Sequence, residues 1–427
     1  MRGKKYIWTL VVVYLAYLCH GVQAIVASQN LGALAIQWGT DAAGVYNAIS
    51  YTGLAKFVTV WICGEISDRI GRRKCAVAGA AMYVIFFLGC MTTTNYAVAC
   101  ACMFLAGAAT SLFDGCLYAA AQESWPKSSG SAVILIKGFI SVSGLLYPML
   151  VVSLRNMGAW KVGLIVPAIA SAVLLVLAMV VPFSYDEELK ARKAAGLSAK
   201  ENAAQLDTEA RAAADRFLQP APKGLVVPLA MMGFVIMAAM YSAQQLLNRY
   251  GSVVIGMSDM KSATLTTLFT TGSLLAVLTW SFMMAKRRWR TLKILIIDLV
   301  GTIISYALVI GTRNENILML AAFTIGFFAA GGALQCGVSL IQEFHPGPKG
   351  RNLGIYYTFM GLSSYVMPKL QSMMTASAGE AAACRTNLSL NMGIAVVGLV
   401  FCLYLCWKYK AWFGVSAMQA KTPDEIY

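Results

Sequence analysis

The chain has 427 residues, of which 59% are hydrophobic and only 12% are charged. Soluble globular proteins carry about a quarter charged residues, so this composition excludes a soluble multi-domain enzyme. The net charge of +15 comes from Lys and Arg residues that cluster between long uncharged stretches. That distribution favours a membrane surface, and not a nucleic acid, as the partner of the positive charge.

Twelve segments have the length that a membrane-spanning helix needs, which is about 20 mostly apolar residues. In chain order they cover residues 6–25, 43–63, 75–91, 96–121, 131–152, 160–181, 225–247, 262–285, 291–310, 317–341, 353–374 and 388–407. The first segment follows basic residues as a signal peptide does, but the internal repeat described below needs six spans in each half. The sequence therefore predicts an all-α membrane protein with 12 transmembrane helices.

The loops between these segments differ in charge. When alternate loops are assigned to opposite sides, the side with both termini holds most of the Lys and Arg residues. Cytoplasmic loops carry such an excess, so we expect both termini in the cytoplasm and a multi-pass protein of the inner, or plasma, membrane.

One loop is long, polar and Ala-rich, which predicts a cytoplasmic linker with a helical segment. The predicted units are residues 1–183, 184–223, 224–408 and 409–427, which are the first bundle, the linker, the second bundle and a tail.

The two halves repeat each other. Seven residues recur 220 positions later in the same register: Cys116, Gln122, Glu123, Pro126, Gly130, Phe139 and Pro148 match Cys336, Gln342, Glu343, Pro346, Gly350, Phe359 and Pro368. Such duplication is typical of secondary transporters, in which a site near the middle of the bilayer lies between two repeats. We therefore expect two pseudo-symmetric six-helix bundles.

The loop after the second span reads GEISDRIGRRK over residues 64–74. Gly71 permits a sharp turn, Asp68 offers an acceptor at the membrane edge, and the basic residues anchor the loop at the cytoplasmic face. A cytoplasmic loop with no further role would carry the same charge. The order of residues resembles the G-x-x-x-D-R-x-G-R-R-K signature of the major facilitator superfamily, found there between spans 2 and 3. The matching residues are Gly64, Asp68, Arg69, Gly71, Arg72 and Arg73.

The resemblance covers essentially the whole chain and implies an alternating-access transporter, whose spans 1, 4, 7 and 10 line a central cavity. Two departures stand out. The second-half counterpart of the signature, residues 284–291, keeps the charge but lacks the Gly and the Asp. The fourth span lacks the Arg of many drug/proton antiporters, which disfavours drug efflux.

Two acids occupy equivalent positions at the cytoplasmic ends of spans 4 and 10, Glu123 and Glu343. In the sugar porters of this family such acids pair with arginines of the signature and lock a cytoplasmic gate. Arg351 follows Glu343, but only Lys127 follows Glu123, so the pattern is looser here. Solvated loop acids beside basic loops are the alternative.

Uncharged polar residues in the spans give candidates for the substrate or proton pathway, namely His20, Gln23, Gln244 and Tyr357. The amides are able to bind a substrate. The alternative is that they bond only a neighbouring helix, as buried amides often do. The histidine is able to relay protons, or simply packs in the bundle. The tyrosine suits an aromatic cavity wall, although aromatic residues in spans also serve in packing.

Three charges lie inside the first half, Lys56, Asp114 and Lys137. Each is about seven or eight residues, on the order of 11 Å, from the cytoplasmic end of its predicted span. A charge at that depth costs a few kcal/mol unless it is paired or hydrated, so we expect Asp114 to bridge one or both lysines. One acid against two bases leaves a positive charge for an anion, and the carboxylate is a candidate proton carrier. An inert ion pair between helices is the alternative.

These residues predict a secondary active transporter for a small organic anion or sugar acid, coupled to protons. Neutral sugars, amino acids and amphipathic compounds remain alternative substrates. A polytopic membrane enzyme or sensor is the alternative from another class, but the sequence shows no catalytic constellation, metal-ligand spacing or phosphate-binding loop. We therefore expect no enzymatic activity, no cofactor and no metal, and as partners only the substrate, protons and the lipid bilayer around a monomer.

Overall fold

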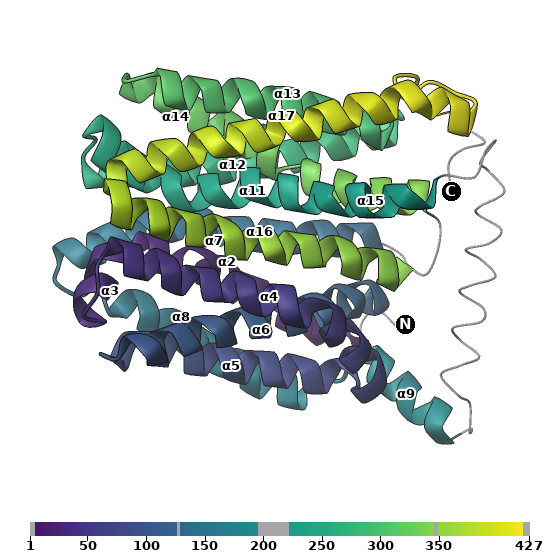
Figure 1. Ribbon diagram of the computed structural model, residues 1–427. Helices are drawn as coiled ribbons and strands as arrows, with labels where there is room; N and C mark the ends of the chain where they lie inside the picture. Colours follow the sequence, from purple (N-terminus) through teal and green to yellow (C-terminus); the bar gives the residue numbers. More distant parts are fainter. Residues whose placement is uncertain (1–4, 126–128, 195–221, 346–348, 422–427) are drawn as a thin grey trace.

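The computed structural model describes residues 5–125, 129–194, 222–345 and 349–421. All regular structure in these ranges is helical, and the long helices run side by side (Figure 1). One end of the molecule carries helix α9 together with the start of α2 and the end of α17, and we call it the linker end. The opposite end, where α3 lies and α17 begins, is called the far end.

The first half forms the amino-terminal bundle. Its helices are α2 (Ile7–Gln29), α3 (Leu31–Gln37), α4 (Ala42–Ile70), α5 (Arg72–Thr92), α6 (Tyr96–Ser124), α7 (Ser129–Asn156) and α8 (Val162–Val180), followed by α9 (Ser184–Ala194) in the predicted linker. Side-chain caps set some of the boundaries, because Asp41 Oδ1 accepts from Gly44 N at 2.8 Å and Asn95 Oδ1 accepts from Ala97 N at 2.9 Å. Capping satisfies backbone donors that the first helical turn leaves free.

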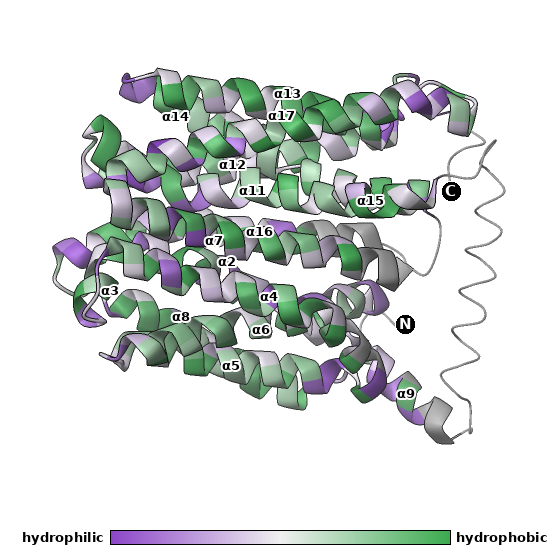
Figure 2. Cartoon of the chain, viewed as in Figure 1, coloured by the Kyte–Doolittle hydropathy of each residue, from purple (hydrophilic) through white to green (hydrophobic). Residues whose placement is uncertain are grey.

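The second half forms the carboxy-terminal bundle. Its helices are α11 (Val226–Tyr250), extended by the π-helical turn η3 (Gly251–Ile255), α12 (Asp259–Lys286), α13 (Thr291–Gly311), α14 (Glu315–Ile325), the π-helical turn η4 (Gly326–Ala330), α15 (Ala333–Phe344), α16 (Lys349–Ala378) and α17 (Glu380–Phe413). Hydrophobic residues cover the helices, and hydrophilic residues gather toward the two ends (Figure 2). Apolar side chains such as Val180, Val397 and Trp407 are largely exposed on the outside, which suits a lipid environment.

Nine helices of the described chain are long and apolar enough to cross a membrane. The other predicted spans correspond to α4, α16 and the interrupted pair α14 and α15. Helices α4 and α16 are long enough but carry Lys56 and Lys369 within their length. Twelve spans and cytoplasmic termini therefore stay predictions.

The predicted tenth span, residues 317–341, is not one continuous helix, because it is interrupted between α14 and α15. Its first-half counterpart α6 is unbroken. Gly331 and Gly332 stand where α6 has Ser111 and Leu112. A Cβ atom on Gly332 would lie 2.2 Å from Trp280 Cδ1, so the close approach of α12 requires glycine at this position. The break coincides with this close tertiary contact.

Two helix pairs form the seam between the bundles, α4 with α16 and α7 with α12. A Cβ atom on Gly361 would lie 2.6 Å from Phe57 N, and one on Gly144 would lie 2.4 Å from Thr270 Oγ1. Small residues let helix backbones approach closely in membranes. The seam thus brings the backbone beside Lys56 directly against the carboxy-terminal bundle.

Candidate functional site

The three predicted intramembrane charges are all partly buried. Measured from the linker-end termini of α4, α6 and α7, Lys56 lies about 21 Å deep, Asp114 about 15 Å and Lys137 about 12 Å. The sequence placed them at one level, and this was wrong. Helices α4 and α6 continue past their apolar segments to Ile70 and Ser124, so Lys56 stands at the middle of its helix.

Asp114 is hydrogen-bonded to a tyrosine. Tyr17 of α2 donates its hydroxyl to Asp114 Oδ1 at 3.0 Å. Neither lysine, both in the described part of the chain, lies within ion-pair distance, so the predicted bridge to Lys56 or Lys137 is absent. Lys56 still lies within electrostatic reach of Asp114, and Lys56 and Lys137 both lie within electrostatic reach of His20, so neither lysine is neutralised by contact with the acid.

His20 belongs to a polar network that joins α2, α5 and α6. Its Nδ1 atom lies 3.1 Å from the hydroxyl of Tyr83, which in turn lies 2.9 Å from Thr110 Oγ1. Thr110 also lies 3.4 Å from Gln23 Oε1. The network places both predicted residues, His20 and Gln23, in one hydrogen-bonded chain. Tyr83 escaped sequence reasoning because it stands in the third predicted span, which is not among the spans that the resemblance assigns to the cavity.

The remaining pathway candidates come from the carboxy-terminal bundle. Tyr357 of α16 is partly buried and lies within electrostatic reach of Asp114 across the seam. Gln244 of α11 is partly buried. Its neighbour Gln245 makes the contact between bundles, because Gln245 Nε2 donates to Ala24 O at 2.5 Å. Two adjacent glutamines in a helix face different directions, and the sequence alone did not show which one meets the seam.

The signature forms the turn between α4 and α5 at the linker end. Gly71 adopts φ 103°, and a Cβ atom there would lie 2.2 Å from Asp186 Oδ1. Asp186 belongs to α9 and accepts from Arg73 N at 3.2 Å. This carboxylate therefore caps the start of α5, where negative charge is favourable. Gly64 lies within α4 and packs near Gly115 of α6.

Arg72 is the buried arginine of the signature. It donates to Ser67 Oγ at 2.7 Å, pairs with Glu123 Oε1 at 3.2 Å, and lies over the ring of Tyr185 at 4.1 Å. The contact with Glu123 is the pair that the resemblance implied, and it stays within the amino-terminal bundle. Arg69 is exposed.

Glu343, the second-half acid, accepts a short hydrogen bond from the hydroxyl of Tyr409 in α17. This contact also stays within one bundle. The side chains of Asp68 and Arg351 lie outside the described part of the structure, so their predicted roles in the gate stay predictions.

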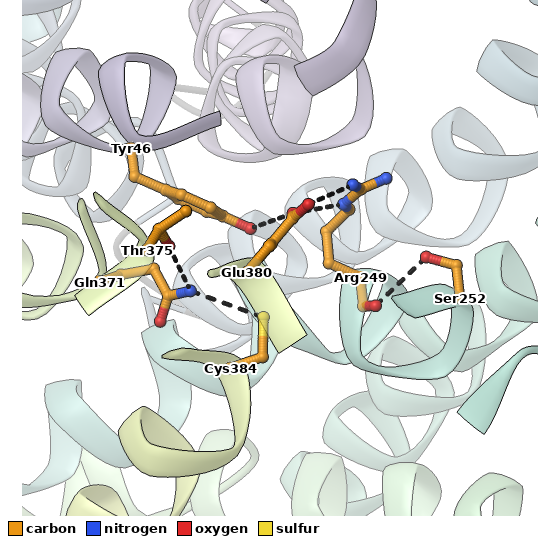
Figure 3. Close-up of polar contacts among 7 residues, drawn as sticks. All are labelled: Tyr46, Arg249, Ser252, Gln371, Thr375, Glu380 and Cys384. Atoms are coloured by element: carbon orange, nitrogen blue, oxygen red, sulfur yellow. Dashed lines mark hydrogen bonds and ion pairs between the residues drawn. The ribbon is translucent and has the colours of Figure 1, made fainter. Parts of the chain in front are cut away.

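The far end holds a cluster that sequence reasoning missed (Figure 3). Arg249 of α11 donates Nε and Nη2 to the two carboxylate oxygens of Glu380 in α17, at 2.7 and 2.6 Å. Tyr46 of α4 adds a hydrogen bond at 3.4 Å from the other bundle. Further contacts across the seam at this end are Lys369 to Asn47 at 2.6 Å, Arg155 to Asp259 at 2.6 Å and Asn248 to Gln29 at 2.7 Å. The far end is therefore closed.

Among the described residues, no group of three or more His, Cys, Asp or Glu is placed to hold a metal ion. Two packed helical bundles with charged side chains at their centre and a closed far end have the architecture of a membrane transport protein. The sequence matches the Major Facilitator Superfamily over residues 13–368, and the chain belongs to this family.

Relatives and solved structures agree with this assignment. The chain is 29% identical to the inner membrane transport protein YdiM of Escherichia coli (strain K12), over 94% of each chain. It is 28% identical to the uncharacterized MFS-type transporter YfkL of Bacillus subtilis (strain 168), over 95% of this chain and 97% of that one. The structure of a D-xylose-proton symporter shares the fold with a TM-score of 0.71 at 16% identity, over 93% of this chain and 97% of that one. The protein is thus a multi-pass inner-membrane transporter of small molecules, and its named relatives point away from an enzyme.

Proposed function

We propose that this protein is a secondary active transporter that moves a small organic anion, such as a sugar acid, across the membrane by alternating access. The observation that carries the proposal is the charge balance around Asp114. Lys56 lies within electrostatic reach of Asp114, whose hydrogen bond comes from Tyr17, and both partly buried lysines, Lys56 and Lys137, lie within electrostatic reach of His20. A charge in a membrane span is costly unless it is paired or hydrated, so the unpaired positive charge favours an anionic ligand.

The proton is the proposed coupling ion. Asp114 stands between a tyrosine hydroxyl and the field of Lys56, so protonation of Asp114 would leave the charge of Lys56 free for an arriving anion, and the anion and the proton would bind cooperatively. The chain from His20 through Tyr83 and Thr110 to Gln23 offers a hydrogen-bonded relay on the neighbouring face of α2. Intramembrane Asp and His residues commonly form such relays in transporters.

The positive-inside rule supports the proposal that the linker end is cytoplasmic and that twelve spans cross the membrane. Residues 1–183 and 224–408 are then the two moving bundles, joined by a linker over 184–223 and followed by a tail over 409–427. With this orientation, the contacts across the seam close the outer side. The protein would exchange substrate with the cytoplasm in this state, and one monomer would contain the whole pathway.

Counterflow in proteoliposomes that contain only this protein tests the proposal. Vesicles loaded with unlabelled D-gluconate should accumulate labelled D-gluconate from outside, with saturation, and an inward proton gradient should increase uptake. Protein-free vesicles are the control. Accumulation of neutral sorbitol in place of gluconate, with no effect of the proton gradient, would show that the proposed anion and coupling ion are wrong.

A further inference from the structure

A small cavity lies on the seam, next to the Arg249, Glu380 and Tyr46 cluster of the far end. Helix α4 contributes Tyr46 and Ile49, α11 contributes Ser242 and Gln245, and α16 contributes Gln371. The cavity leaves about 10 Å³ for the centre of a water molecule, which is about the least space that admits one hydroxyl-sized group. Both bundles therefore form its walls.

Three polar atoms of this wall have no hydrogen-bond partner among the described residues, namely Ser242 Oγ, Gln245 Oε1 and Gln371 Oε1. Their residues are only 3%, 4% and 1% exposed. A buried polar atom without a partner costs about 1–3 kcal/mol, and three of them at one cavity call for a ligand.

The amide nitrogens fix how the two glutamines are oriented. Gln245 Nε2 donates to Ala24 O, and Gln371 Nε2 donates to Thr375 Oγ1 at 3.3 Å and to Cys384 Sγ at 3.5 Å (Figure 3). With their nitrogens committed, both amides leave an oxygen as a free acceptor. The cavity thus needs a group that donates hydrogen bonds.

A hydroxyl group fits this chemistry better than the other small donors. A carboxylate has no proton to donate to the amide oxygens. An ammonium group would bring a charge into a site of neutral oxygens, which is costly without a paired acid. The nearby acid Glu380 is already held by Arg249.

We propose that Ser242, Gln245 and Gln371 bind a hydroxyl group of the transported anion, which makes the substrate a hydroxylated acid. This inference rests on the proposed function. Ile49 and Lys56 are separated by seven residues of α4, which corresponds to about 10 Å. A ligand with its hydroxyl in the cavity and its carboxylate toward Lys56 is an extended hydroxy acid.

Calorimetric titration of the purified full-length protein tests the proposal with four probes of six carbons. These are D-gluconate, hexanoate, sorbitol and 6-aminohexanoate, which separate hydroxyl, carboxylate and ammonium groups. Wild-type protein should bind gluconate at least about tenfold more tightly than hexanoate or 6-aminohexanoate. Equal binding of gluconate and hexanoate, including no binding of either, would overturn the proposal, and so would a preference for 6-aminohexanoate.

Variants of the cavity residues test whether the preference for gluconate arises at this cavity. Ser242→Ala and Gln371→Leu should each weaken gluconate binding about tenfold and leave hexanoate binding unchanged. Ser363→Ala is the matched control, because Ser363 Oγ is also buried without a partner on α16 but does not line the cavity. Equal losses for both acids, or a loss in the control of the same size, would overturn the proposal. Binding of sorbitol as tight as that of gluconate, but still dependent on Gln371, would support the hydroxyl site and refute the anion proposal separately.

Discussion

The two ends of the molecule use the same kinds of polar contact for different purposes. At the far end, Lys369 to Asn47 and Arg155 to Asp259 join the two bundles across the seam. At the linker end, the contact of Arg72 with Glu123 stays inside one bundle. The far-end contacts therefore hold the bundles together, whereas this linker-end contact shapes one bundle. The family signature belongs to the second kind of contact.

The far-end contacts are suited to a reversible closure. Exposed ion pairs contribute about 0–1 kcal/mol each, and a typical hydrogen bond contributes about 0.5–1.5 kcal/mol. The Arg155 to Asp259 pair is largely exposed, with side chains at 39% and 62% exposure. A few such contacts favour the state with a closed far end over the state with an open far end, but only by a few kcal/mol. A ligand that binds the two states differently is then able to shift the equilibrium between them.

The largest effect is expected from the charges between the two ends. Lys137→Met removes one of the two positive charges and should abolish gluconate uptake, by about a hundredfold or more, because an anion then faces Asp114 with less compensation. Lys161→Met makes the same change on an exposed lysine and should leave uptake intact. Uptake by Lys137→Met at the wild-type rate, in protein that remains folded in detergent, would reduce these charges to a structural role.

Asp114→Asn tests whether Asp114 carries the proton that is coupled to uptake. It keeps a polar group opposite Tyr17 but cannot carry a proton, so uptake should lose its dependence on pH while counterflow persists at a reduced rate. Uptake measured across a series of external pH values checks this. A pH profile identical to that of the wild type would exclude Asp114 as the carrier.

The next largest effect is expected from removing a contact between the bundles at the far end. Lys369→Met removes a charge-assisted hydrogen bond to Asn47 across the seam and should open this end, because a hydrogen bond to a charged group contributes about 1.5–3 kcal/mol. Labelling of Leu246→Cys by an impermeant maleimide in intact cells should accelerate about tenfold. Glu315→Gln breaks the exposed pair with Lys261 inside one bundle, and it should not change the labelling rate. Equal acceleration by both variants would contradict the assigned difference.

The linker end should respond differently. Glu123→Gln removes the partner of Arg72 and should slow uptake several-fold, with gluconate affinity changed by no more than a few fold. Labelling of Leu246→Cys should stay at the wild-type rate, because the broken contact does not cross the seam. If Glu123→Gln accelerated this labelling as strongly as Lys369→Met does, the two ends would not differ as described.

The smallest effect is expected from Tyr46→Phe. It removes one long hydrogen bond across the seam, at 3.4 Å, and should accelerate far-end labelling about two- to threefold. Tyr250→Phe is the matched control, since that hydroxyl donates to Val309 O inside the carboxy-terminal bundle. A larger effect from Tyr250→Phe than from Tyr46→Phe would argue against Tyr46 as a contact that closes the seam.

The sequence predicted what depends on local composition. Apolar length located the helices, and the repeat is visible in the matching boundaries of α7 and α16, which begin at Ser129 and Lys349 and both contain a proline. The break between α14 and α15 was not predicted from apolar length, and it coincides with the close approach of the Trp280 ring to Gly332. A gap in a hydropathy pattern does not reveal such a contact.

The candidate site was harder to predict than the fold. The sequence selected Asp114 but not its partner Tyr17, because the partner is set by helix rotation and by helix ends that extend beyond the apolar segments. Arg249 and Glu380 are separated by 131 residues, and neither stands in a recognisable motif. The acceptors of the cavity were missed for the same reason, since only the meeting of the bundles brings Gln245 and Gln371 together.

The most direct test of alternating access measures both ends in one experiment. Spin labels at Met157→Cys and Arg313→Cys report the distance across the far end, and labels at Lys74→Cys and Arg287→Cys report the linker end, all at exposed positions. Pulsed electron resonance in nanodiscs should show one short far-end distance without substrate. Gluconate at acidic pH should add a longer far-end distance together with a shorter linker-end distance. Distances that stay fixed, or that change at one end alone, would contradict alternating access in this protein.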